Sequence, residues 1–183
     1  MKLRELLAGV PICAGSADLE MEISGVSYDS RTTRPGDLFV AMTGFATDGH
    51  QYIAKALANG AAAVLCQRRP AEACAYVQTE DSRRALAVIG GNWFGHPAEE
   101  MTMIAVTGTC GKTTTTYLLK AILEQARGVK VGLIGTNQNM IGSDVIPTER
   151  TTPESFEVQK LFRKMADAGC THVVMETSSH ALY

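Results

Sequence analysis

The feature that most constrains the fold is a glycine- and threonine-rich stretch at residues 106–116, which reads V-T-G-T-C-G-K-T-T-T-T. The short apolar run from Met101 to Val106 precedes it and is typical of a buried strand. Helical spacing follows, and the apolar residues along one side of that helix are Leu118, Leu119, Ile122 and Ala126. A strand, a glycine-rich loop and a helix in this order form the arrangement that binds the phosphates of a nucleotide.

Within this stretch, the backbone N–H groups of the loop and the N-terminus of the helix are expected to face the phosphates. Lys112 is expected to reach the β- and γ-phosphates, and Thr113 to offer its hydroxyl to Mg²⁺. The first glycine of the general pattern G-x-x-x-x-G-K-[ST] falls at Val106, so an ordinary strand-to-helix turn with a surface lysine stays an alternative. The residues expected to contact the nucleotide are Gly108, Thr109, Cys110, Gly111, Lys112, Thr113 and Thr114.

Composition argues against several other kinds of protein. The net charge is −2 and no basic stripe is present, so nucleic acid is not the expected partner. No apolar stretch approaches the length of a membrane span, and residues 3–7 fit a short amphipathic helix better than a signal peptide. The five cysteines include no C-x-x-C pair, which favours free thiols in a reducing compartment. We therefore expect a cytoplasmic protein with no membrane partner.

Strand and helix patterns alternate along the chain, which predicts α/β architecture with parallel sheets. Residues 23–42 predict strand, turn, strand, and the apolar runs at 62–66 and 75–78 predict two further strands. Helices are expected around residues 53–57 and after an N-cap at Asp81-Ser82. The expected core of this part is Phe39, Val40, Leu57, Val64, Leu65, Leu86 and Ile89. The breaker-rich segment 95–100 marks a boundary, giving domains at 1–98 and 99–183.

In the second domain, residues 130–135 and 172–175 predict strands, and the polar segment 137–152 allows a hairpin. A helix is expected to start with Thr152 as N-cap and Pro153 in its first position, and to end at Gly169. Its expected buried residues are Val158, Leu161, Phe162 and Met165. Because ligands bind beyond the carboxyl ends of parallel strands, Gly108, Thr136 and Glu176 should line one crevice.

Several polar residues have both a functional and a structural interpretation. Glu176 ends an apolar strand and could hold Mg²⁺ together with Thr113, or could cap the amides of residues 177–179. Thr151 and Thr152 could contact a polar substrate or cap the following helix, and Ser30 could contact a ligand or stabilise its own loop. His180 is expected to be structural.

Five stretches together point to a known family, and they occur in that family's order over nearly the whole chain. They are Y-D-S-R-T-T-R-P-G-D-L-F-V-A-M at 28–42, G-F-A-T-D-G-H at 44–50, T-G-T-C-G-K-T-T-T at 107–115, I-P-T-E-R-T-T-P-E at 146–154 and M-E-T-S-S-H-A-L at 175–182. With them the chain resembles the Mur ligases of bacterial peptidoglycan synthesis, in particular the UDP-N-acetylmuramoyl-tripeptide synthetases. It departs from the family pattern at Cys110, where the family commonly has asparagine, and at Arg150, where some relatives have asparagine.

The resemblance implies a small N-terminal α/β domain that holds the UDP end of UDP-N-acetylmuramoyl-dipeptide. The first part of a phosphate-loop, parallel-sheet ATPase domain would follow it. Ser30 would lie beside the uridine, and the loop of Phe45, Ala46 and Thr47 would lie against the nucleotide. The residues that would contact the muramoyl-peptide portion are Thr151, Thr152 and Ser178.

The implied reaction uses ATP and Mg²⁺, with Lys112 and Glu176 as the catalytic residues. ATP would phosphorylate the terminal carboxylate of the dipeptide, and the amine of the incoming amino acid would attack the resulting acyl phosphate. The residues do not determine whether that amino acid is meso-diaminopimelate, L-lysine or another. The family implies an amino-acid domain beyond Tyr183, so we expect residues 1–183 alone not to catalyse ligation.

Three other interpretations stay open at this point. The related ligase that adds D-alanyl-D-alanine has similar first domains, although the stretches at 146–154 and 175–182 argue against it. A folylpolyglutamate synthetase shares the ATPase core but lacks the loop that contains Ser30. The chain could also be a nucleotide-binding module without ligase activity.

Overall fold

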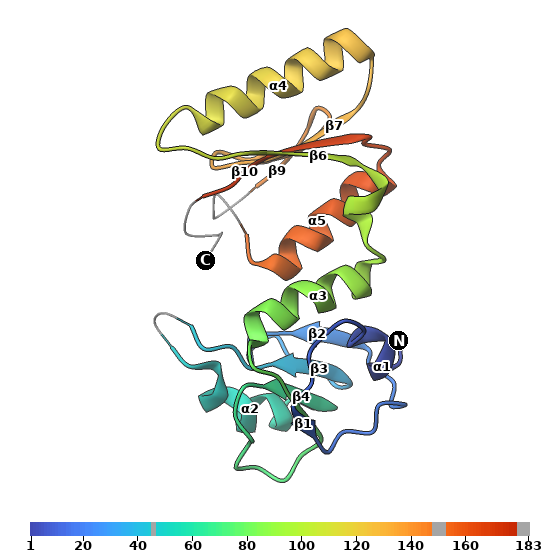
Figure 1. Cartoon of the computed structure of the whole chain (residues 1–183), viewed down its shortest axis with the longest axis vertical. Helices are drawn as coiled ribbons and strands as arrows, with labels where there is room; N and C mark the ends of the chain where they lie inside the picture. The colour runs from blue at the N-terminus through green and yellow to red at the C-terminus, as the bar shows by residue number, and fades with distance from the viewer. Residues whose placement is uncertain (45–46, 148–152, 179–183) are drawn as a thin grey trace. The chain divides into compact units, whose positions relative to one another are not determined.

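The computed structural model describes residues 1–44, 47–147 and 153–178. The chain divides into two compact units, Met1–Trp93 and Phe94–Tyr183, which are described separately below (Figure 1). The division lies five residues before the predicted boundary between 98 and 99. The assignment of separate functions to two domains stays a prediction. The predicted contact residues Phe45, Ala46, Thr151 and Thr152 lie outside the described residues, as does His180.

The first unit is built on a five-stranded sheet with the order β1-β5-β4-β3-β2. Strands β2 to β5 are parallel, as predicted, whereas the edge strand β1 runs antiparallel to β5 and was not predicted. The strands are β1 (Ala14–Gly15), β2 (Gly25–Ser27), β3 (Asp37–Val40), β4 (Ala63–Cys66) and β5 (Tyr76–Gln78). Short polar loops follow the carboxyl ends of β2, β3 and β4.

The helices of the first unit are α1 (Leu3–Leu6), the 3₁₀ turn η1 (Gly49–Tyr52), α2 (Ile53–Ala58) and α3 (Ser82–Phe94). The predicted cap of α3 is confirmed, since Asp81 Oδ1 accepts hydrogen bonds from the backbone N–H groups of Arg83 and Arg84 at 2.9 and 3.0 Å. The predicted core is also confirmed at every position except Leu57, which is only partly buried.

The second unit contains a five-stranded mixed sheet with the order β6-β10-β7-β8-β9. Strands β6, β10 and β7 are parallel, and β7, β8 and β9 form an antiparallel meander that includes the hairpin allowed by the sequence. The strands are β6 (Thr102–Val106), β7 (Val131–Ile134), β8 (Asn139–Ile141), β9 (Asp144–Ile146) and β10 (His172–Glu176). The strand that leads into the glycine-rich loop therefore lies at one edge of the sheet.

Helix α4 (Lys112–Arg127) covers one face of this sheet and α5 (Ser155–Asp167) covers the other, while the 3₁₀ turn η2 (Pro97–Glu100) packs near α5 (Figure 1). The predicted start of α5 at Thr152-Pro153 was wrong. Glu154 is the N-cap, in an extended conformation, and its carboxylate accepts from the Ser155 N–H at 3.3 Å. Because this side chain supplies the cap, the helix begins two residues beyond Pro153.

Most of the predicted apolar side of α4 is exposed, and Leu119 is partly buried. Leu118 and Ile122 are each 58% exposed, whereas Thr116 and Lys120 are buried on the opposite side. The Lys120 ammonium is paired with both carboxylate oxygens of Glu124 at 2.7 Å, which compensates its burial. Over the described residues, no helix has the length and apolar character that crossing a bilayer requires.

This orientation of α4 leads to a stability prediction. Leu118→Lys replaces an exposed side chain with another good helix former, so the free energy of unfolding should change by less than about 0.5 kcal/mol. Leu133→Ala, at a fully buried position of β7, should lower it by about 2–5 kcal/mol. Urea denaturation measures both. A loss at Leu118 as large as that at Leu133 would mean that α4 buries its apolar side.

Candidate functional site

The loop between β6 and α4 has the geometry of an anion site. Residues 107–111 are exposed, and α4 starts at Lys112 directly after them. Gly111 is the N-cap of α4 with φ of +78°, a left-handed conformation that favours glycine. The Lys112 ammonium folds over the loop and donates to the Gly108 carbonyl at 2.8 Å. The lysine is thus held where it can reach a phosphate on the loop amides.

A buried carboxylate lies beside the start of α4. Glu176, at the end of β10, is fully buried, and its Oε2 accepts from the hydroxyls of Thr113 at 3.1 Å and Thr136 at 2.9 Å. Its Oε1 accepts from the Thr136 N–H at 3.0 Å. Thr136 and Glu176 are therefore in contact, and the crevice that they are expected to share with Gly108 stays a prediction.

The backbone around this carboxylate leaves no spare room. A Cβ at Gly135 would lie 2.6 Å from Glu176 Oε1, so only glycine allows the close approach of β7 to the carboxylate. The Gly135 N–H donates to Oδ1 of the buried Asn139 at 3.3 Å. Sequence analysis did not identify Gly135 or Asn139 as parts of the site. The glycine that ends the predicted strand K-V-G-L-I-G was the sequence signal that could have identified Gly135.

The residues at this position fit Mg²⁺. Cis ligands of an octahedral Mg²⁺, each about 2.1 Å from the ion, lie about 3.0 Å apart. The Thr113 and Glu176 oxygens are 3.1 Å apart. In the part of the chain that the structure describes, no cluster of three or more His, Cys, Asp or Glu side chains suits a metal. A cation held by Thr113 and Glu176 would take its remaining ligands from phosphate and water, as nucleotide-bound Mg²⁺ does.

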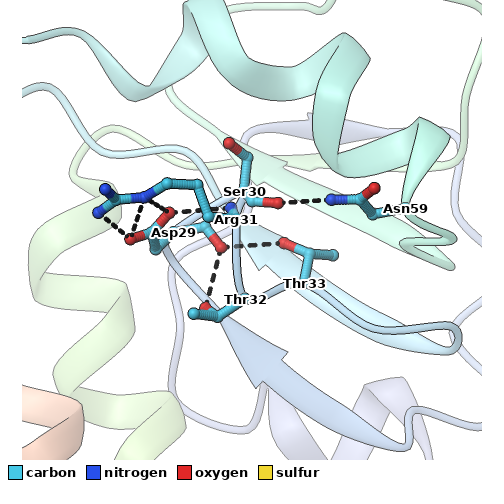
Figure 2. A network of polar contacts seen from close by, with 6 residues as sticks. All are labelled: Asp29, Ser30, Arg31, Thr32, Thr33 and Asn59. Carbon is cyan, nitrogen blue, oxygen red and sulfur yellow. Dashed lines mark hydrogen bonds and ion pairs between the residues drawn. The ribbon is translucent and has the colours of Figure 1, made fainter.

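A second candidate site is a pocket of about 490 Å³ in the first unit, which contains Ser30. Ser30 is only 5% exposed, and its carbonyl accepts from Nδ2 of Asn59 at 2.7 Å. Figure 2 shows its hydroxyl pointing away from the contacts drawn, and Ser30 is one of the residues that line the pocket. A hydroxyl in the wall of a pocket can donate to a bound ligand or accept from it.

The loop that presents Ser30 is held by its neighbours (Figure 2). The Asp29 carbonyl accepts from the hydroxyls of Thr32 at 3.0 Å and Thr33 at 3.2 Å. Arg31 donates to the Asp29 carboxylate at 2.6 Å, and this hydrogen bond holds the pKa of Asp29 below its usual value. Asp29 and Arg31 both line the pocket.

The rest of the pocket lining combines positive charge with aromatic rings. The cations are Arg31, Lys55 and Arg83, and the aromatic residues are Tyr28, Phe39 and Tyr52. This combination suits an anionic ligand that carries a flat ring. Sequence analysis missed Lys55, Arg83 and Tyr52, because they lie outside the stretches that it singled out. Their convergence depends on helices that the sequence does not place next to Ser30.

The remaining predicted contact residues are dispersed. Thr47 is exposed and lines the same pocket as Ser30. Thr109, Cys110 and Thr114 are exposed at the glycine-rich loop, and Ser178 is partly buried two residues beyond β10. Their proposed roles stay predictions.

Sequence comparison finds matches along both units. The model of the Mur ligase family catalytic domain matches residues 22–101, and the model of the Mur ligase middle domain matches residues 106–183. A protein of Caldanaerobacter subterraneus subsp. tengcongensis named UDP-N-acetylmuramoyl-L-alanyl-D-glutamate–2,6-diaminopimelate ligase is 50% identical over 184 aligned positions, covering 100% of this chain and 38% of that protein. A protein of the same name from Clostridium botulinum is 48% identical over 88% of this chain and 34% of its own length.

Structural comparison agrees. A solved structure of a UDP-N-acetylmuramoyl-L-alanyl-D-glutamate–2,6-diaminopimelate ligase superposes with a TM-score of 0.81 at 27% identity, covering 100% of this chain and 37% of that one. MurF ligase from Thermotoga maritima in complex with ADP gives a TM-score of 0.58 at 27% identity, over 84% of this chain and 32% of that one. The chain thus spans between 32% and 38% of the length of these relatives. Since the two matched domain models together account for most of its residues, the chain belongs to the Mur ligase family.

Proposed function

We propose that this chain supplies the nucleotide-sugar and ATP sites of a ligase that acts on UDP-N-acetylmuramoyl-L-alanyl-D-glutamate. The third residue that it adds would be 2,6-diaminopimelate, as the names of relatives 48–50% identical to it state for those proteins. The observation that carries the proposal is the Thr113–Glu176 pair beside a glycine-rich loop at the start of a helix. That pair suits a nucleotide with its Mg²⁺. The five free cysteines support a reducing compartment such as the cytoplasm.

In the second unit, the loop amides and Lys112 would bind the ATP phosphates. Lys112 Nζ is already at the loop, 2.8 Å from the Gly108 carbonyl, and a phosphate oxygen would replace this weak partner. Thr113 and Glu176 would hold Mg²⁺, which neutralises charge on the transferred phosphoryl group. The structural neighbour solved with ADP supports an adenine nucleotide as a ligand.

In the first unit, the Ser30 pocket would hold the UDP end of the substrate. The Ser30 hydroxyl would hydrogen-bond the uridine, and a tyrosine of the lining would pack on the flat base. The cations Arg31, Lys55 and Arg83 would face the diphosphate. A pocket with hydroxyl, aromatic and positive groups matches each part of a pyrimidine nucleoside diphosphate.

The proposed reaction has two steps. The terminal carboxylate of the dipeptide attacks the γ-phosphorus of ATP, releasing ADP and forming an acyl phosphate. The amine of diaminopimelate then attacks the acyl carbon, and phosphate leaves as the amide bond forms. Lys112 and the loop amides would stabilise the charge that develops on the phosphoryl oxygens, which is the main requirement of phosphoryl transfer.

Binding measurements on two variants test the assignment of the two sites. Lys112→Ala removes a cation from the phosphate loop and should weaken ATP binding by about 10- to 100-fold, with UDP binding unchanged. Ser30→Ala should weaken UDP binding by about 3- to 10-fold without changing ATP binding. Isothermal titration calorimetry gives each dissociation constant.

Thr115→Ala is the matched control for Lys112→Ala, because Thr115 is exposed in the same first turn of α4 and lies outside the proposed contacts. ATP binding that is unaffected by Lys112→Ala would contradict the phosphate-loop assignment. ATP binding without any UDP binding would favour a nucleotide-binding module of another kind.

Cys110 provides an independent probe of the loop. It is exposed within residues 107–111, so a thiol reagent should label it and thereby block ATP binding, and bound ATP should slow the labelling. Burial raises the pKa of Cys66 to about 11, so that thiol should stay unreactive at neutral pH. The Cys110→Ser variant retains exposed Cys13 and gives the background rate. Equal labelling of Cys110 with and without ATP would show that the nucleotide does not occupy the loop.

We also propose that residues 1–183 by themselves bind these ligands without ligating them. The relatives contain more than twice this length, since the chain covers 34–39% of each. Positioning of an amine against an acyl phosphate contributes about 7–11 kcal/mol in favourable cases, and no described residue is assigned to it. An assay of ATP-dependent phosphate release with the UDP-dipeptide and diaminopimelate should therefore stay at background. Sustained product formation would contradict this proposal.

A further inference from the structure

A polar chain of three residues lies beside the Ser30 pocket and has no role in the function proposed so far. Asp48 Oδ1 accepts from the backbone N–H of His50 at 3.0 Å and contacts Nδ1 of its ring at 2.6 Å. On the other side of the ring, the backbone N–H of Gln67 donates to His50 Nε2 at 3.0 Å. The His50 side chain is 11% exposed, so both ring nitrogens are engaged in a largely buried setting.

These contacts determine the protonation state of the ring. A backbone N–H can only donate, so Nε2 of His50 must accept and carries no proton. The single ring proton is therefore on Nδ1 and is donated to Asp48. Protonation of Nε2 would remove the acceptor that Gln67 requires. Asp48 also pairs with Arg68, and its hydrogen bonds from His50 hold the pKa of Asp48 below its usual value.

Gln67 is held in place by hydrogen bonds to several other parts of the first unit. It follows β4 directly, and its carbonyl accepts from Gln78 Nε2 at 3.1 Å at the end of β5. Its side chain donates to the Glu80 carbonyl at 3.0 Å and accepts from the Ser82 hydroxyl at 3.0 Å at the start of α3. Through His50, the segment around Asp48 is thereby joined to the ends of β4 and β5 and to α3.

The segment that His50 secures forms one wall of the pocket. An antiparallel bridge between Thr43 and Asp48 closes it, together with hydrogen bonds from Gly44 N to Thr47 O at 2.9 Å and from Gly49 N to Met42 O at 2.7 Å. The described residues of this segment that line the pocket are Met42, Gly44, Thr47 and Gly49. Asp48 and His50 are not among the residues that line the pocket, so they act on it only through this wall.

We propose that His50 is a positioning residue for the nucleotide pocket, because it ties the wall formed by Met42, Gly44, Thr47 and Gly49 to the sheet through Asp48 and Gln67. The inference rests on the proposed function, since the ligand of that pocket is taken to be UDP. This wall of the pocket is thus positioned before the ligand binds, which reduces the entropy lost on binding. The geometry requires a side chain that donates toward Asp48 and accepts from Gln67, and neutral histidine does both.

The test measures UDP and ATP dissociation constants for the chain and for His50→Ala. Loss of both ring hydrogen bonds should weaken UDP binding by about tenfold and leave ATP binding unchanged. His50→Gln places an amide oxygen where it can accept from Gln67, so it should recover a large part of the UDP affinity. His50→Phe fills the space without either hydrogen bond and should bind UDP as weakly as His50→Ala.

A matched control separates positioning from general destabilisation. Ile89→Val removes one buried methylene from α3 and should lower stability by about 0.5–1.5 kcal/mol without touching the wall. Its UDP affinity should equal that of the unmodified chain at a temperature where both variants are folded. If His50→Ala binds UDP as tightly as Ile89→Val does, or if His50→Gln recovers nothing, the positioning role is overturned.

The same titrations distinguish the two proposals. If UDP binds neither the unmodified chain nor any variant, the assignment of the pocket to UDP is wrong and the inference falls with it. If UDP binds and Ser30→Ala weakens it while His50→Ala does not, the pocket assignment stands and only the role of His50 is wrong.

Discussion

The buried carboxylate of Glu176 is the interaction on which the second unit's site depends. A polar group with no exposure is tolerated only when its atoms are hydrogen-bonded, and Thr113 and Thr136 supply such bonds to the Glu176 oxygens. The partners come from the first turn of α4 and from the end of β7, so one carboxylate joins three elements that are distant in sequence. The position of the glycine-rich loop relative to the sheet follows from this junction. Replacing the carboxylate would leave two hydroxyls and an N–H without this partner. The hydrogen bonds that hold the glycine-rich loop in place against the sheet would then be lost.

The first unit places its pocket by the same topological rule with different chemistry. Ser30 follows β2, Met42 follows β3 and Gln67 follows β4, all at the carboxyl ends of parallel strands. In both units the strands determine where a site lies, and short polar loops determine what it binds. The second unit presents loop amides, a lysine and a carboxylate, which suit the phosphate chain and cation of the proposed ligand. The first unit presents hydroxyl, aromatic and positive groups, which suit the proposed nucleoside diphosphate.

Local sequence signals predicted much of this arrangement. The strand, loop and helix around Lys112 were predicted because glycines and threonines at fixed spacing leave few other conformations. The proximity of Thr136 and Glu176 followed from the rule for parallel strands. The face of α4 was not predictable from its apolar residues, because the bond from Thr113 to Glu176 fixes the rotation of the helix and leaves Leu118 outside. Lys55 and Arg83 were missed because their approach to Ser30 depends on tertiary packing, and the tautomer of His50 depends on a single distant N–H group.

The uncovered side of α4 has a practical consequence for spectroscopy. The helix starts at the phosphate loop, and at about 1.5 Å of rise per residue Leu118 lies roughly 9 Å along the axis from Lys112. A fluorophore or spin label attached at position 118 would be exposed to solvent and away from the proposed nucleotide. It would still be attached to the helix that begins directly after the loop. Changes in the mobility or emission of the label would therefore report the conformational change of the loop when a ligand binds. They can be followed in real time without a radioactive or coupled assay.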